Sequence, residues 1–225
     1  MKRFSMFRIS KFILFYLITI FYFNFSSAQG FEGYYQNPTL YNNKIAFVAE
    51  GDLWTVPLSG GLAQRLTTHA EEENFPSISP DGKTIAFSAS YEGPLEVYTM
   101  PIQGGLPTRW TYENDASVVN SWTPDGKLVY STRAYSKVPD KQIVSIDLIT
   151  KQKTKIPLAQ ASEATYDDSG KTVYFVRPAY HRNVTKRYKG GTARQIWKFT
   201  QRTKEAVKLT KGYLGGSHHP MWFSG

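Results

Sequence analysis

The sequence predicts an all-β protein built from repeated four-stranded antiparallel units. The turn motif PDGK at residues 80–83 recurs at 124–127 and, in altered form, at 168–171, so that its glycines lie 44 residues apart twice. An apolar pair in alternate positions follows each turn, which is the pattern of a strand with one buried face. The aromatic content of 15%, with 17 Gly and 12 Pro, favours strands joined by tight turns.

Four strands can be placed in each unit in chain order. The apolar pairs that mark the second strand are Ile45 with Phe47, Ile85 with Phe87, Leu128 with Tyr130, and Val173 with Phe175. Third strands are predicted at residues 53–56, 97–100, 143–146 and 196–199, and fourth strands at 64–67, 108–111, 154–157 and 207–210. The pairs Gly60-Gly61 and Gly104-Gly105 separate the third and fourth strands of the first two copies, where a hairpin needs positive φ.

A period of this length is typical of the blades of WD40-like β-propellers. The predicted blades span residues 37–68, 74–112, 118–157 and 162–210, and a fifth begins at 218, where HPMW at 219–222 aligns with FPSI at 75–78. Propellers close with about 4 to 8 blades, and here the last has only begun. We therefore expect an incomplete β-propeller over residues 29–225.

The first 28 residues predict a secretory signal peptide. A basic start precedes an almost wholly apolar run at residues 12–23, and Ser26 and Ala28 put small residues at the −3 and −1 positions of a cleavage site. The alternative, a membrane anchor, needs roughly 20 apolar residues, so no stable membrane span is expected. We expect an exported protein, periplasmic or secreted. The absence of Cys excludes disulfides and thiolate metal sites.

Two stretches carry a family resemblance. The run from YQNP at residues 35–38 into KIAFVAEGDLWTVP at 44–57, and the block KRYKGGTARQIW at 186–197, resemble the amino-terminal propeller of tricorn-type proteases. The resemblance covers residues 33–225 and departs at Thr185, where the family usually has Trp, and in the altered turn at 167–170.

The resemblance implies a large serine peptidase with a six-bladed propeller, a seven-bladed propeller, a PDZ-like domain and a catalytic domain. The propellers of such enzymes are expected to channel peptides to and from an enclosed site, and a homo-oligomer is implied. None of the family's catalytic positions falls within this stretch, so no catalytic residue is predicted here.

A basic stretch near the end of the chain is the predicted site of peptide attraction. Residues 177–211 hold eleven Lys and Arg against one acidic residue, Glu205. A field of that sign attracts acidic peptides or peptide carboxyl ends, with Lys186, Arg187, Lys189 and Arg194 as the candidate residues. Nucleic acid, the alternative ligand, does not fit an exported protein, and a solvated blade edge remains the simpler interpretation.

Other candidate groups predict no metal, cofactor or catalysis. Asp81, Asp125 and Asp168 lie in equivalent turns, where a carboxylate forms the turn itself. Among the four His, at 69, 181, 218 and 219, the adjacent pair is expected to point two ways along a strand, with no third ligand. No Gly-x-Ser-x-Gly elbow occurs, and Gly190-Gly191 lacks the spacing of a phosphate-binding loop.

Two alternatives to the peptidase propeller remain open. A non-enzymatic periplasmic propeller would bind partners without cleaving them. The propeller of a prolyl-oligopeptidase-type enzyme would accompany an α/β-hydrolase domain with a nucleophile elbow.

Overall fold

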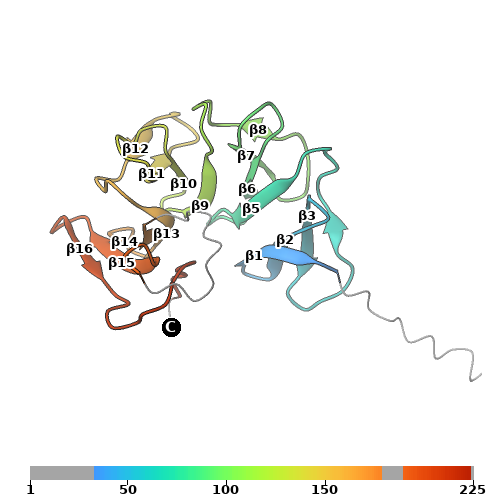
Figure 1. Cartoon of the computed structure of the whole chain (residues 1–225). Helices are drawn as coiled ribbons and strands as arrows, with labels where there is room; N and C mark the ends of the chain where they lie inside the picture. The colour runs from blue at the N-terminus through green and yellow to red at the C-terminus, as the bar shows by residue number, and fades with distance from the viewer. Residues whose placement is uncertain (1–32, 179–189, 224–225) are drawn as a thin grey trace, which may run out of the picture. The chain divides into compact units, whose positions relative to one another are not determined.

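The computed structural model describes residues 33–178 and 190–223. Within these ranges the chain forms sixteen strands and no helix, and therefore no helix that could cross a membrane. The strands make four antiparallel four-stranded sheets, each with its strands in chain order (Figure 1). The predicted all-β class and the four-stranded antiparallel unit are thus confirmed. The blade number of a closed propeller and the signal peptide stay predictions.

The first sheet comprises β1 (Tyr35–Tyr41), β2 (Lys44–Ala49), β3 (Asp52–Pro57) and β4 (Gln64–Arg65), and the second comprises β5 (Glu73–Ile78), β6 (Thr84–Ala89), β7 (Glu96–Pro101) and β8 (Thr108–Arg109). The third comprises β9 (Val118–Trp122), β10 (Leu128–Thr132), β11 (Gln142–Ile146) and β12 (Lys153–Lys155), and the fourth comprises β13 (Ser162–Tyr166), β14 (Thr172–Arg177), β15 (Gln195–Thr200) and β16 (Glu205–Lys208).

Hydrophobic cores fill the three spaces between successive sheets. Ile85 and Phe87 pack toward the first sheet, whereas Ala86 between them packs toward the third, because the central sheets have neighbours on both faces. The first sheet has only one described neighbour. Its predicted buried pair, Ile45 and Phe47, is consequently half-exposed, and the alternate residues Ala46 and Val48 form the buried face instead.

One backbone hydrogen bond recurs where the chain passes from one unit to the next. The N–H at the start of a unit's first strand donates to the carbonyl of the residue before the third strand of the preceding sheet. The pairs are Glu73 with Gly51 (2.8 Å), Ser117 with Leu95 (2.7 Å), Ala161 with Lys141 (2.9 Å) and Ser217 with Arg194 (2.8 Å). The last pair places Ser217 where a further first strand would begin, although the described residues after Lys208 form no strand.

Three of the four first strands share a β-bulge that places a residue at positive φ. The register shifts in β1, β5 and β13 coincide with φ values of 48° at Asn37, 53° at Phe75 and 52° at Glu163. A bulge bends the strand and re-aims a side chain. His219 has φ 53° and follows Ser217 by two residues, as Phe75 follows Glu73. The segment after residue 217 therefore has the backbone signature of a first strand.

Each repeated turn holds a carboxylate, and in the first copy it bonds the backbone ahead of it, as the sequence predicts. In the second copy the N–H of Lys127 donates to Oγ1 of Thr123 at 2.8 Å instead. Asp81 accepts the N–H two residues further on at 3.0 Å, and Asp125 pairs with the ammonium group two residues further on at 2.7 Å. In the third copy Asp167 accepts the N–H of Lys171 at 3.1 Å. The prediction of Asp168 for this role is wrong by one residue, because the altered motif DSGK no longer shows which Asp caps the turn.

Gly82 is expected to tolerate alanine less well than its repeat equivalent Gly126. Both have positive φ, 70° and 84°, but a Cβ on Gly82 would lie 2.9 Å from Cε1 of Tyr41, while a Cβ on Gly126 meets nothing within 4 Å. Tyr41 in turn donates a hydrogen bond from its hydroxyl to the Pro80 carbonyl. Gly126→Ala should cost about 1 kcal/mol through φ alone, and Gly82→Ala about 2–3 kcal/mol. Urea unfolding of both variants tests this, and equal losses would contradict it.

Candidate functional site

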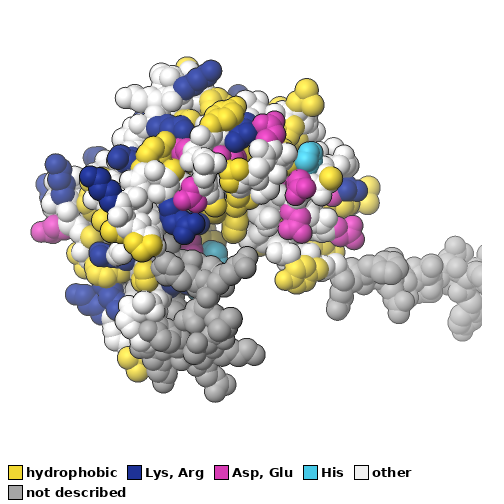
Figure 2. Space-filling model, turned by 45° about the horizontal axis from the view of Figure 1, so that its top comes forward, with side chains coloured by type: hydrophobic (Ala, Val, Ile, Leu, Met, Phe, Trp, Pro, Cys, Tyr) yellow, Lys and Arg dark blue, Asp and Glu magenta, His cyan; other side chains and the backbone are white. Residues whose placement is uncertain are grey.

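Positive charge gathers on the fourth sheet. Figure 2 shows Lys and Arg side chains on the side of the β13–β16 sheet and Asp and Glu on the side of the first sheet. The sequence accounts for this division, because residues 34–116 hold four Lys and Arg against ten Asp and Glu, and residues 117–225 hold nineteen against seven. The two halves of the described sheets therefore carry opposite net charge.

The described basic residues of the stretch 177–211 form what we call the basic surface: Arg177, Arg194, Lys198, Arg202, Lys204, Lys208 and Lys211. Within this surface Arg177 has two contacts, since its guanidinium lies 5.7 Å from the ring centre of Trp197 and donates from Nε to Oε1 of Gln160 at 3.1 Å. Such stacking holds a guanidinium in place while leaving an edge available to ligand carboxylates.

Of the four residues predicted to attract peptides, Lys186, Arg187 and Lys189 lie outside the described residues. The fourth, Arg194, is half-buried just before β15 and donates from Nη1 to Oε1 of Glu163 at 3.1 Å. Part of its charge is thus used inside the protein, to link β15 to the bulge of β13. The prediction that these four act as one peptide-attracting loop stays untested.

His218 and His219 lie together against Glu163. The sequence analysis expects adjacent side chains to point two ways, but the positive φ of His219 brings the rings to the same side, with centroids 4.6 Å apart. The His219 N–H donates to Oε2 of Glu163 at 2.7 Å, and Nδ1 of the same residue lies 3.6 Å from that oxygen. Partial burial, with the nearby Arg194 charge, lowers the pKa of His218.

A threonine clamp recurs inside three of the four sheets. The Oγ1 of a threonine that follows the fourth strand accepts the N–H of the second residue of the third strand, in the pairs Thr67 with Leu53 (2.8 Å), Thr111 with Val97 (2.8 Å) and Thr210 with Ile196 (3.2 Å). In the second and fourth sheets the same hydroxyl donates to the first side chain of the third strand, Glu96 or Gln195. The Thr67 hydroxyl instead donates to Oε2 of Glu73 at 2.8 Å and lies 3.4 Å from Oδ1 of Asp52. The third sheet has Pro157 at this position. The clamp was not predicted, although the repeated threonine is visible in the sequence.

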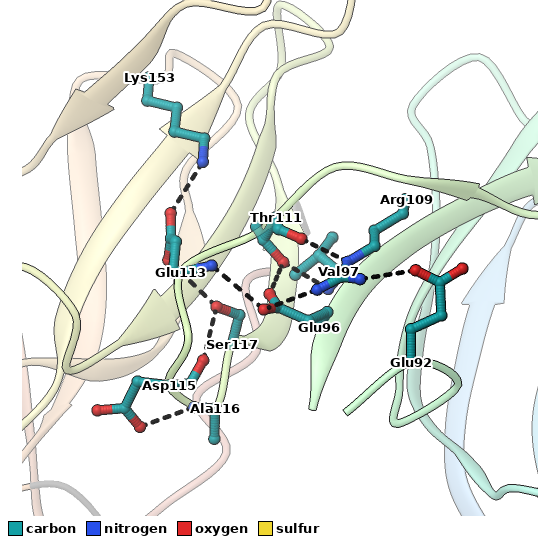
Figure 3. Close-up of polar contacts among 10 residues, drawn as sticks. All are labelled: Glu92, Glu96, Val97, Arg109, Thr111, Glu113, Asp115, Ala116, Ser117 and Lys153. Atoms are coloured by element: carbon teal, nitrogen blue, oxygen red, sulfur yellow. Dashed lines mark hydrogen bonds and ion pairs between the residues drawn. The ribbon is translucent and has the colours of Figure 1, made fainter. Parts of the chain in front are cut away.

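Two buried carboxylates anchor the passage from the second sheet to the third (Figure 3). Glu96, whose side chain is 1% exposed, accepts the Thr111 hydroxyl, and Nη2 of Arg109 lies 3.3 Å from its Oε1. The N–H of Glu113 donates to the same oxygen at 3.2 Å. Glu92, which is exposed, holds the other end of the guanidinium at 2.8 Å. Arg109 thus forms ion pairs with both Glu92 and Glu96, and this arrangement stabilises the fold.

The second of these carboxylates, Glu113, collects donors from the third sheet. Its Oε1 accepts from the hydroxyls of Tyr130 (2.6 Å) and Tyr135 (2.7 Å) and from Nζ of Lys153 (2.9 Å). Burial acts to raise the pKa of Glu113, but these donors outweigh it and the pKa is lowered. Glu73 is the contrasting case, because burial outweighs its bonds from Tyr91 and Thr67 and raises its pKa. Glu113 bonds side chains of the third sheet, and Glu73 bonds Thr67 at the end of the first sheet, so both carboxylates are assigned to the fold.

Comparison with known proteins gives the chain its relatives. Residues 32–225 match the family described as the tricorn protease N-terminal beta propeller domain. Tricorn protease homolog 1 of Streptomyces coelicolor is 31% identical over 192 residues, which cover 84% of this chain and 18% of that protein. The chain thus spans about a fifth of the length of that curated relative.

Solved structures agree on the fold. The crystal structure of the tricorn protease matches with a TM-score of 0.74 and 21% identity, covering 85% of this chain and 20% of that one. TolB from Acinetobacter baumannii matches with a TM-score of 0.63 and 22% identity, covering 79% of this chain and 44% of that one. At these identities both likenesses concern the fold alone.

Proposed function

Because this chain belongs to the tricorn protease N-terminal beta propeller family, we propose that it is the substrate-channelling propeller of an exported serine peptidase that degrades short peptides. The observation that carries the proposal is the family match over residues 32–225. Catalysis is assigned to another part of the full-length protein, because the family match covers a propeller domain. A homo-oligomer is part of the same proposal, because the family resemblance implies one.

The charge division supports a role in handling peptides. Charged surfaces raise the local concentration of oppositely charged ligands and speed their approach, over distances of about 8–10 Å at physiological salt. The basic surface would draw in acidic side chains and peptide carboxylates, and the acidic first two sheets would repel them. A peptide moving past this propeller would therefore be oriented by its charges before it reached a catalytic domain.

Reversing charge on the basic surface should raise KM for acidic peptides. In the full-length protein, Lys204→Glu with Lys208→Glu changes the last residue of β16 and a residue of the turn before it. We expect KM for an acidic peptide to rise about threefold to tenfold at low salt, with kcat unchanged, because approach and not chemistry is altered. KM for a neutral peptide of equal length should stay constant. An equal rise for both peptides would contradict steering by charge.

A matched control reverses charge on the other half. Glu71→Lys with Glu72→Lys adds positive charge near the start of the second sheet, where both side chains are exposed. These variants should leave KM for the acidic peptide unchanged or lower it. A rise in KM would show that any surface change disturbs the enzyme.

Peptidase activity and export are tested on the full-length protein as well. Hydrolysis of short peptides, with labelling by a fluorophosphonate that reacts with activated serine, is the expected result. N-terminal sequencing should begin at Gln29. A protein that binds peptides but neither cleaves them nor reacts would be the non-enzymatic propeller, and a labelled serine inside a Gly-x-Ser-x-Gly elbow would indicate the prolyl-oligopeptidase type.

A further inference from the structure

Three side chains with metal-binding atoms converge where the segment after residue 216 meets the fourth sheet. Glu163 comes from the bulge of β13, and His218 and His219 come from the segment that follows β16. One ligand atom from each lies within 4.8 Å of the others. We propose that Glu163, His218 and His219 form a binding site for a transition-metal dication of the Zn²⁺ class.

The distance between the Glu163 carboxylate and the His219 imidazole fits two ligands of one ion better than a direct hydrogen bond. Nδ1 of His219 lies 3.6 Å from Oε2 of Glu163, which is too long for a hydrogen bond. Two ligands about 2.0–2.1 Å from a tetrahedral zinc ion lie about 3.3–3.4 Å apart. Closing this pair on an ion requires only a few tenths of an ångström, and His218 is exposed and can turn to join it.

The backbone already holds the two histidines in place. Ser217 donates its N–H to the Arg194 carbonyl at 2.8 Å, and His219 donates its own to Glu163 at 2.7 Å. Gln195 donates from Nε2 to the Gly215 carbonyl at 2.9 Å. These bonds tie the segment to β13 and to the start of β15, so little chain entropy is lost when the ion binds.

The ligand types select the class of ion. Two imidazoles and one carboxylate suit zinc and similar borderline ions, and this set leaves a fourth position for water. Calcium and magnesium prefer oxygen ligands only.

Arg194 sets the strength of the site. Its guanidinium holds Oε1 of Glu163 at 3.1 Å, which leaves Oε2 for the ion but adds a positive charge nearby. Repulsion between the two cations weakens metal binding. The bound ion would join the segment 217–219 to β13. It would thereby strengthen the link to the next unit, where Ser217 already forms the recurring backbone hydrogen bond with Arg194.

Titration of the full chain with Zn²⁺ tests the proposal. Isothermal calorimetry should give one ion per chain, and Co²⁺ in its place should show the absorption bands of four-coordinate cobalt. The melting temperature should rise by about 5 °C or more at a hundredfold excess over Kd. His218→Ala, His219→Ala and Glu163→Gln should each weaken binding at least tenfold.

Two further variants make the outcome decisive. His69→Ala removes a histidine that is not one of the three proposed ligands and lies against Tyr91, with ring centroids 3.9 Å apart. This variant should bind the ion as the original chain does. Arg194→Gln should bind it more tightly, since a repelling charge is removed. The proposal is overturned if no ion binds below millimolar concentration, if His69→Ala weakens binding as much as His218→Ala, or if Arg194→Gln weakens it.

Discussion

Replacing Arg109 with Leu is expected to destabilise the protein by about 3 kcal/mol, because it leaves a buried carboxylate without its cation. Glu96 is 1% exposed, and Nη2 of Arg109 lies 3.3 Å from it. The guanidinium also donates from Nε to the Thr111 carbonyl at 2.8 Å and lies 4.3 Å from the ring centre of Tyr112. Urea unfolding followed by tryptophan fluorescence measures the loss.

The cause of that loss can be separated from lost packing. Glu96→Gln added to Arg109→Leu removes the buried charge and keeps an acceptor for the Thr111 hydroxyl. The double variant should therefore be more stable than Arg109→Leu alone, by about 1 kcal/mol or more. Glu92→Gln is the matched control, because Glu92 is 69% exposed and its pair with Arg109 is worth about 0–1 kcal/mol. If the double variant were less stable than Arg109→Leu, lost packing and not the unpaired buried charge would account for the destabilisation.

The strands and the unit were predictable from the sequence because both depend on local patterns. Ile85 with Phe87, and Val173 with Phe175, alternate as a half-buried strand requires, and all four are buried. What alternation cannot show is how many neighbours a sheet has. The half-exposed Phe47 differs from Phe87 only because no described sheet covers that face of the first sheet.

The candidate metal cluster was not predictable for a different reason. Adjacent residues on a regular strand point to opposite faces, so the sequence analysis separated His218 from His219. A bulge with positive φ at His219 reverses this, and such a bulge carries no strong sequence signal when the residue is not Gly or Asn. The one available signal was the alignment of His219 with Phe75, which has the same φ of 53°.

Glu73 and Glu113 should shift stability with pH in opposite directions, although both are buried glutamates with an ordinary pKa of 4.5. The pKa of Glu113 is lowered in the folded state, so the stability it contributes is present above pH 4.5 and lost as pH falls through the folded pKa. The pKa of Glu73 is raised, so its contribution is complete below pH 4.5 and lost as pH rises through the folded pKa.

Replacing each glutamate singly with glutamine shows how its contribution to the free energy of unfolding changes with pH. Glu113→Gln should cost about 2 kcal/mol at pH 7, since charge-assisted bonds from Tyr130, Tyr135 and Lys153 are weakened, and this cost should shrink toward pH 3.5. The cost of Glu73→Gln should instead shrink as the pH rises from 4 to 7, because the amide cannot take on the unfavourable buried charge. Urea unfolding of both variants between pH 3.5 and 7 gives the comparison. If the destabilisation by both variants changed with pH in the same direction, the hydrogen bonds from Tyr91 and Thr67 would outweigh burial at Glu73. Glu73 would then behave like Glu113.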